Sequence, residues 1–326
     1  MSHQQNQTAG AAAPRTRRER VGISISAADA PALVGIIEEA EAAGVEQLWM
    51  TQNPVSLDSL TVFAAACERT TRVRLGTSIV PTYPRHPLAL AQQAATVAAL
   101  GPGRLRLGVG PSHRPSIEGT YGIPMEAPLA HLKEYVGILR AALWDGAVDH
   151  RGRFFTAKAK LNTTPRVPLL ISTLGEGAFR LAGEVADGAI SWNCPVPYLL
   201  DTGLPALREG AAAAQRPTPT LVAHVWIALS TDTAAVHAAA RQRLAGYARL
   251  PFYANMFAAA GYPVQSDGSV SEALVDNLVV MGDETAVGAR LDELLASGLD
   301  ELLLTAVPLE DEAAERTRLF ELVGQL

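Results

Sequence analysis

The sequence predicts an α/β fold in which one folded domain forms a (β/α)8 TIM barrel, with insertions after strands 4 and 7. The chain has 326 residues, which is enough for one large α/β barrel. Eight short apolar runs alternate with amphipathic segments, and this alternation is typical of parallel strands covered by helices. The alternative is a doubly wound open sheet. It is disfavoured because no G-x-G-x-x-G motif follows the first apolar run.

The expected strands are the short apolar runs, each followed by a turn or a long loop. They cover residues 21–26, 46–51, 72–80, 104–110, 168–173, 188–193, 220–229 and 300–307. The segment 150–157 is expected to form a small hairpin outside this series, and residues 231–282 form the largely helical insertion after strand 7.

Helices are expected wherever apolar residues recur at three-to-four spacing behind a start signal. Asp58 can cap a helix that runs to Glu68, and Pro87 suits the first position of a helix that runs to Leu100. The other expected helices cover residues 31–43 and about 126–144, the segment from the fifth strand to Ala186, and residues 283–296 and 311–322.

The composition excludes several classes of protein. Residues 1–20 are polar and alanine-rich, so we expect a disordered N-terminal tail ahead of a single domain over residues 21–326. The net charge of −6 offers no basic field for nucleic acid. No apolar run reaches the ~18 residues of a membrane span, and no signal peptide is evident. The two cysteines, Cys67 and Cys194, cannot build a disulfide framework, so a cytoplasmic protein is expected.

Active sites of such barrels lie at the carboxyl ends of the strands. There His113 is the one ionisable group placed for proton transfer, although a lone histidine can also be purely structural. No H-E-x-x-H or Cys-x-x-Cys motif occurs, so no metal site is expected. The residues at the ends of the second, third and fourth strands are Gln52, Asn53, Thr77, Ser78, Ile79, Pro111 and Ser112, most of them polar or small.

The turn after the fifth strand is the most specific physical signal in the sequence. Gly175 and Gly177 lie where a helix begins, so unobstructed backbone N–H groups can point out of its N-terminus. Such a turn suits an anion, in particular a phosphate. The alternative is a glycine-rich turn selected only for tightness.

The stretch "LGTSIVPTYPRHPLALAQQAATVAALGPGRLRLGVGPSH" resembles the luciferase-like monooxygenase superfamily, specifically its branch that uses the deazaflavin coenzyme F420. The resemblance is strong from Val21 to about Asn193. It implies a non-proline cis peptide at Ser78–Ile79 that backs the central ring of the cofactor. It also implies that the phosphate rests on the turn formed by Thr173, Leu174, Gly175, Glu176, Gly177 and Ala178. Gln52 and Asn53 would lie near the ring, with Pro111, Ser112 and His113 opposite.

The chain departs from this family's pattern at two places. Relatives that oxidise sugar phosphates and alcohols carry Asp-His after strand 2 and Gly-Glu after strand 4, whereas this chain has Gln52-Asn53 and Ser112-His113. No lysine occurs beyond Lys160 to bind a substrate phosphate. We therefore expect an F420-dependent oxidoreductase that acts as a reductase on a small organic substrate, with His113 supplying the proton.

Two alternatives remain open at this stage: an FMN-dependent monooxygenase, because the anion turn suits either phosphate, and a catalytically silent cofactor-binding protein. Family members are often dimers, so a homodimer is also possible.

Aromatic and sulfur-containing side chains of the insertion suggest an apolar or aromatic ligand. The alternative is that they pack the insertion onto the barrel or onto a second subunit. These side chains are Tyr247, Phe252, Tyr253, Met256, Phe257 and Tyr262.

Overall fold

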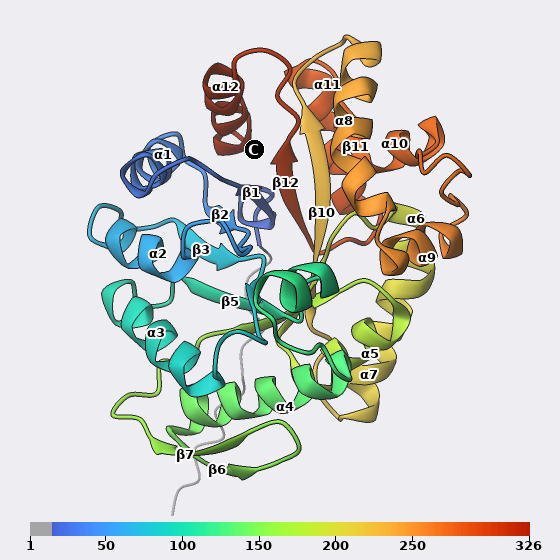
Figure 1. Ribbon diagram of the computed structural model, residues 1–326. Helices are drawn as coiled ribbons and strands as arrows, with labels where there is room; N and C mark the ends of the chain where they lie inside the picture. Colours follow the sequence, from blue (N-terminus) through green and yellow to red (C-terminus); the bar gives the residue numbers. More distant parts are fainter. Residues whose placement is uncertain (1–14) are drawn as a thin grey trace, which may run out of the picture.

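The computed structural model describes residues 15–326, which form a closed parallel β-barrel surrounded by helices (Figure 1). Neighbouring strands pair in parallel around the ring, and the last strand pairs with the first to close it. This confirms the predicted (β/α)8 barrel. In ring order the strands are β1 (Val21–Ser24), β2 (Gln47–Met50), β3 (Arg74–Thr77), β5 (Leu105–Gly110), β8 (Leu169–Thr173), β9 (Gly188–Ser191), β10 (Thr220–Ala228) and β12 (Glu301–Ala306).

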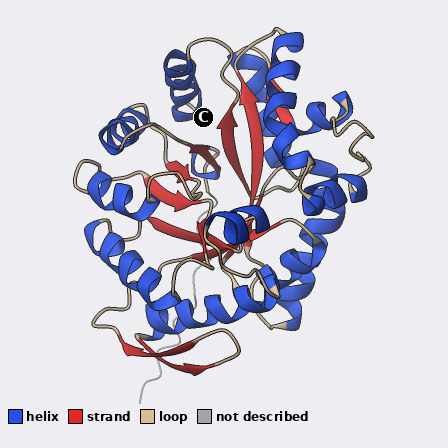
Figure 2. Cartoon of the chain, in the orientation of Figure 1, coloured by secondary structure: helices blue, strands red, loops and turns tan. Residues whose placement is uncertain are grey.

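Helices cover the outside of the barrel (Figure 2). Several begin where an aspartate side chain accepts a backbone N–H of the first turn, as Asp58 does for α2 and Asp283 does for α11. The expected helix at about 126–144 is present as α4, which passes at Arg140 directly into a π-helical turn (Ala141–Asp145). The helices next to the strands are α1 (Ala30–Ala42), α2 (Ser59–Cys67), α3 (Pro87–Leu100), α4 (Pro128–Arg140), α5 (Glu176–Val185), α7 (Leu204–Ala213), α11 (Glu284–Ala296) and α12 (Glu312–Gly324).

The connection between β9 and β10 contains three helical segments that were not predicted: the short α6 (Val196–Tyr198), a π-helical turn (Leu199–Gly203) and α7. Helix α7 packs on α5 with little space between them. A Cβ atom added at Gly183 of α5 would lie 2.2 Å from the carbonyl oxygen of Leu207. The absence of a side chain at Gly183 therefore allows α5 and α7 to approach each other closely.

The insertion after β10 contains α8 (Thr233–Ala248), α9 (Pro251–Ala259), α10 (Glu272–Leu278) and a short strand, β11 (Val279–Met281). Strand β11 was not predicted, and it pairs in parallel with the carboxyl end of β10. Strand β9 pairs only with the first three residues of β10. The insertion therefore lies over the carboxyl end of the barrel, on the β9–β10 side.

The expected small hairpin is present and is wider than the predicted segment 150–157. Its strands β6 (Ala147–Arg151) and β7 (Thr156–Lys160) pair antiparallel, and they lie beside α4 outside the barrel (Figure 1).

Strand 3, expected as one run over residues 72–80, is interrupted. After β3 the Ser78–Ile79 peptide bond is cis, as the family resemblance implies, and Ser78 N–H donates to the carbonyl of Met50 at 2.9 Å. Pairing resumes in β4 (Val80–Pro81), which lies beside β5. The interruption brings Ser78 and Ile79 to the carboxyl end of the barrel.

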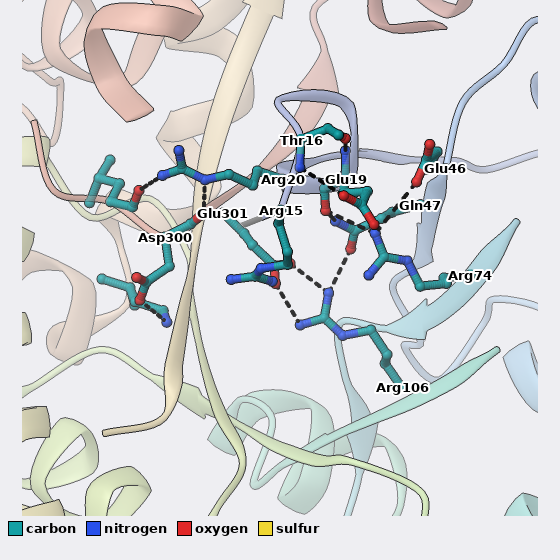
Figure 3. A network of polar contacts seen from close by, with 12 residues as sticks. Arg15, Thr16, Glu19, Arg20, Glu46, Gln47, Arg74, Arg106, Asp300 and Glu301 are labelled. Carbon is teal, nitrogen blue, oxygen red and sulfur yellow. Dashed lines mark hydrogen bonds and ion pairs between the residues drawn. The ribbon is translucent and has the colours of Figure 1, made fainter. Parts of the chain in front are cut away.

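The opposite end of the barrel is closed by polar side chains (Figure 3). Buried Glu301 pairs with Arg106 of β5 and with Arg15, and Arg106 also donates to Gln47. Residues 18–20 form a 3₁₀ turn, and Arg20 donates to the carbonyl oxygens of Leu299 and Asp300. The tail prediction is therefore wrong for residues 15–20, because their arginines bind the base of the barrel. Residues 1–14 of the predicted tail lie outside the described residues.

Within residues 15–326, none of the helices combines the length and the apolar character that crossing a membrane requires.

Candidate active site

A cavity of about 850 Å³ opens at the carboxyl ends of the barrel strands. The β2–α2, β3–β4, β5–α4 and β8–α5 connections surround it, and the insertion covers it from the side of α8 and α9. This volume is in the range of small-molecule and cofactor sites. It also lies where active sites of this barrel class are found.

Most of the residues proposed from the sequence line this cavity. They are Gln52, Asn53, Ser78, Ile79, Pro111, Ser112, His113, Thr173, Leu174, Gly175 and Ala178.

Three of the proposed residues do not line it. Thr77 is fully buried, and its hydroxyl donates a hydrogen bond to the Gly108 carbonyl and accepts one from the Gly108 N–H. The Glu176 carboxylate pairs with Arg180 on the surface of α5. Gly177 lies in the first turn of α5, and a Cβ atom there would face Leu129 at 3.4 Å. Glu176 and Gly177 can therefore contribute only backbone N–H groups to a ligand.

Gln52 and Asn53 organise the β2–α2 connection. The side-chain amide oxygen of Gln52 accepts a hydrogen bond from the Ser59 hydroxyl at 2.9 Å, and its side-chain nitrogen donates to the Asp58 carboxylate at 3.2 Å. Asn53 accepts backbone N–H groups from Val55 and Ser56. Both amide groups are thus engaged within the loop that borders the cavity.

The N-terminus of α5 opens into the cavity without a side-chain cap. Gly175 occupies the capping position, no side chain bonds to the first turn, and a Cβ atom at Gly175 would meet no atom within 4 Å. Its carbonyl accepts the N–H groups of Ala178 and Phe179, whereas those of Glu176 and Gly177 precede the first intrahelical bond. Free N–H groups and the helix dipole together favour an anion here.

His113 also lines the cavity, half-buried among aromatic rings of the insertion. Its ring centroid lies 6.2 Å from that of Tyr247, 5.4 Å from Phe252 and 5.8 Å from Tyr253. Burial lowers the pKa of His113 below its ordinary value, because the apolar rings disfavour the charged imidazolium. The neutral imidazole therefore dominates at neutral pH.

The aromatic and sulfur-containing side chains of the insertion divide between the cavity and the core. Tyr247, Phe252, Tyr253 and Met256 line the cavity. Phe257 is fully buried in the main core, and neither it nor Tyr262 lines the cavity.

The lining of the cavity carries almost no charge. It contains no aspartate, glutamate or lysine, and its only arginine, Arg114, pairs with Glu118 in an exposed position. Within the described part of the chain, no group of three or more His, Cys, Asp or Glu side chains could hold a metal ion. A cation that could bind a substrate phosphate deep in the cavity is therefore missing from its lining.

Comparison with known proteins assigns the chain to a protein family. Residues 10–301 match the family model of the luciferase-like monooxygenases. The chain belongs to this family. Its relatives include a protein of Nocardia farcinica named F420-dependent glucose-6-phosphate dehydrogenase, which is 30% identical over 275 residues, or 80% of this chain and 81% of the relative. A protein of the same name from Nakamurella multipartita is 36% identical over 200 residues, which is 57% of each chain.

Solved structures show the same fold for this luciferase-like chain. The F420-dependent tetrahydromethanopterin reductase of Methanopyrus kandleri aligns with a TM-score of 0.79 and 22% identity, covering 94% of this chain and 97% of the reductase. An F420-dependent secondary alcohol dehydrogenase aligns with a TM-score of 0.77 and 21% identity, covering 93% and 97%. At these identities the likeness establishes the fold alone.

Some cavity residues on helices of the barrel wall carry no functional signal in the sequence, in contrast to the aromatic side chains of the insertion. Leu129 and Leu132 reach it from α4, and Tyr198 reaches it from α6. Trp192 also lines it and did carry a signal, because it directly follows β9. It stacks on buried His224 with ring centroids 3.8 Å apart, and its indole N–H donates to the Tyr247 hydroxyl at 3.1 Å.

Proposed function

We propose that this protein is an F420-dependent oxidoreductase that works as a reductase, transferring hydride from reduced F420 to a small organic substrate. The observation that carries the proposal is the uncapped N-terminus of α5, which opens at Gly175 into the same cavity that Ser78 and Ile79 border. The names of the Nocardia and Nakamurella relatives support F420 over other flavin-type cofactors.

The residues present fit this coenzyme. Gly175 leaves space for a phosphate at the free N–H groups of Glu176 and Gly177. Ile79, Leu174 and Ile190 give the cavity apolar surface suited to a planar ring. When bound, F420 supplies the hydride carrier, a two-electron chemistry that protein side chains lack. The chain's own part is to hold the ring and the phosphate and to bind the substrate beside them.

Reduction is favoured over alcohol oxidation by the groups around the cavity. Alcohol-oxidising relatives of the family carry an Asp-His pair after strand 2, whereas no carboxylate lines this cavity to pair with His113. Gln52, where alcohol-oxidising relatives of the family carry aspartate, is an amide engaged with Asp58 and Ser59. His113 is the remaining proton carrier. In the reductive direction its imidazolium form gives a proton to the substrate.

Equilibrium titration of the purified protein with F420 and, separately, with FMN tests the proposal, using the fluorescence of each ligand. We expect tight binding of F420 and at least about tenfold weaker binding of FMN, a difference of ~1.4 kcal/mol. Binding of FMN alone would reassign the protein to FMN-dependent oxygen chemistry. Binding of neither would overturn the assignment of the α5 turn to a cofactor phosphate.

We further infer a cytoplasmic location, supported by the buried free thiols of Cys67 and Cys194. Burial raises the pKa of Cys194 to about 12, so this thiol is unreactive. A homodimer, implied by the family resemblance, stays a prediction.

A further inference from the structure

We propose that the substrate is an uncharged, planar, conjugated carbonyl compound, bound on an aromatic wall with its oxygen accepting a hydrogen bond from the Tyr253 hydroxyl. The aromatic wall consists of His113, Tyr247, Phe252 and Tyr253. This inference rests on the proposed function, because it assigns the substrate class of the same cavity. In the reduction, the conjugated C=C bond gains one hydride and one proton and becomes a single bond, while reduced F420 is oxidised.

The aromatic wall is continuous. Tyr253 lies at its centre, with ring centroids 5.0 Å from Tyr247, 5.1 Å from Phe252 and 5.8 Å from His113. Phe252 is partly exposed at the edge of the cavity, with 36% of its surface accessible, whereas Tyr253 is only 4% exposed. Flat unsaturated ligands pack well against such rings, because offset and edge contacts add to the burial of apolar surface.

Tyr253 also supplies an available hydrogen-bond donor. Within residues 15–326 its hydroxyl has no hydrogen-bond partner, although the residue is almost fully buried and lines the cavity. Burial raises its pKa well above the usual value, so the hydroxyl keeps its proton. The hydroxyl oxygen keeps some accessible surface, so a substrate carbonyl oxygen in the cavity can accept its hydrogen bond.

The electrostatics of the cavity select against charged substrates. No lysine lines it, and the Arg114 guanidinium is exposed and engaged with Glu118. An anion such as a sugar phosphate would lose its hydration beside the aromatic wall without gaining a buried cation. An uncharged compound does not incur this penalty. The chain therefore differs in substrate class from the relatives named for glucose 6-phosphate.

Calorimetric titration with matched probes tests the inference. Benzylideneacetone is neutral, planar and conjugated. Cinnamate has a similar skeleton with a negative charge, and glucose 6-phosphate is a phosphorylated sugar. Each probe is titrated into the full-length protein with and without saturating F420, whose own binding is measured first by fluorescence. The variants are Tyr253→Phe, which removes only the hydroxyl, and Tyr262→Phe, the same change in the same insertion outside the cavity.

We expect benzylideneacetone to bind at least about tenfold more tightly than cinnamate or glucose 6-phosphate. We expect Tyr253→Phe to weaken its binding by about three- to tenfold, the range for one lost hydrogen bond, and Tyr262→Phe to leave it unchanged. Preference for either anion, no binding of the ketone, or equal effects of the two variants would overturn the substrate class. Those results together with intact F420 binding leave the proposed function standing. Loss of F420 binding alone overturns the proposed function. In that case the titration of benzylideneacetone without coenzyme still shows whether the aromatic wall binds the ketone.

Discussion

The indole of Trp49 fills the middle of the barrel directly against Gly76 of the neighbouring strand. A Cβ atom at Gly76 would lie 2.3 Å from Cε3 of Trp49. Trp49 packs there with Leu170, Ile190 and Leu303, and Ile79 at the border of the cavity packs against the same cluster. The side chains that fill the barrel thus support the floor of the candidate site.

Replacement of Gly76 by alanine should destabilise the protein by about 1–3 kcal/mol, because the indole cannot move without displacing its neighbours. Thermal or urea unfolding measures the loss. Gly35→Ala in α1 is the matched control, because its Cβ would meet no atom within 4 Å and the change should be neutral or slightly stabilising. Equal stability of the two variants would show that the interior does not depend on this contact.

The buried ion pair at the base of the barrel should be important for stability. Glu301→Gln leaves Arg106 without its carboxylate, and breaking such a pair costs about 3–5 kcal/mol. Asp149→Asn, in an exposed pair with Lys158, should cost less than ~1 kcal/mol. Urea denaturation of both variants decides this prediction, and similar small losses would contradict it.

The same carboxylate predicts a pH dependence of stability. Burial alone would raise the pKa of Glu301, but Arg106 and Arg15 outweigh burial and hold the pKa below its usual value. A lowered folded-state pKa stabilises the protein above the ordinary pKa of the carboxyl group, and this contribution is lost as the pH falls through the folded-state pKa. The acid-side loss of stability should therefore be smaller in Glu301→Gln than in the wild type. Parallel stability curves would argue against the assignment.

The role of His113 predicts how turnover depends on pH. Proton donation requires the imidazolium form, and burial lowers the pKa of His113. The kcat for substrate reduction should therefore rise as the pH falls from 7 toward that lowered pKa. His113→Phe keeps an aromatic ring in place and should reduce kcat about 100-fold or more while removing this pH dependence. Wild-type turnover and pH profile in the variant would exclude His113 as the proton donor.

The barrel was predictable from sequence because each strand–helix unit carries its own local signals, such as the Asp58 cap of α2 and Pro87 at the start of α3. Local patterns did not reveal β11, which is three residues long and depends on pairing with β10. They also misread residues 15–20, because the order of that segment depends on Glu301, which is distant in sequence.

Some residues of the candidate site also had local signals in the sequence, whereas others did not. The strand ends and the glycine turn at Gly175 were visible because barrel topology places them together. Leu129 and Leu132 of α4 were not, because their stripe has the spacing of ordinary core packing. The contact between His113 and Tyr253 joins two connections far apart in the chain, so only the folded structure reveals it.

The central claim is that the N-terminus of α5 binds the phosphate of F420, and titration of F420 into Gly175 variants tests it most directly. Gly175→Asp places a carboxylate at the capping position, where aspartate is well tolerated and the fold should be preserved. Gly175→Ala adds only a methyl group in open space. F420 should bind the aspartate variant at least about tenfold more weakly, because the added charge repels the phosphate and the added oxygen occupies the free N–H groups. F420 should bind the alanine variant with unchanged affinity. Wild-type affinity in a folded aspartate variant would contradict the central claim.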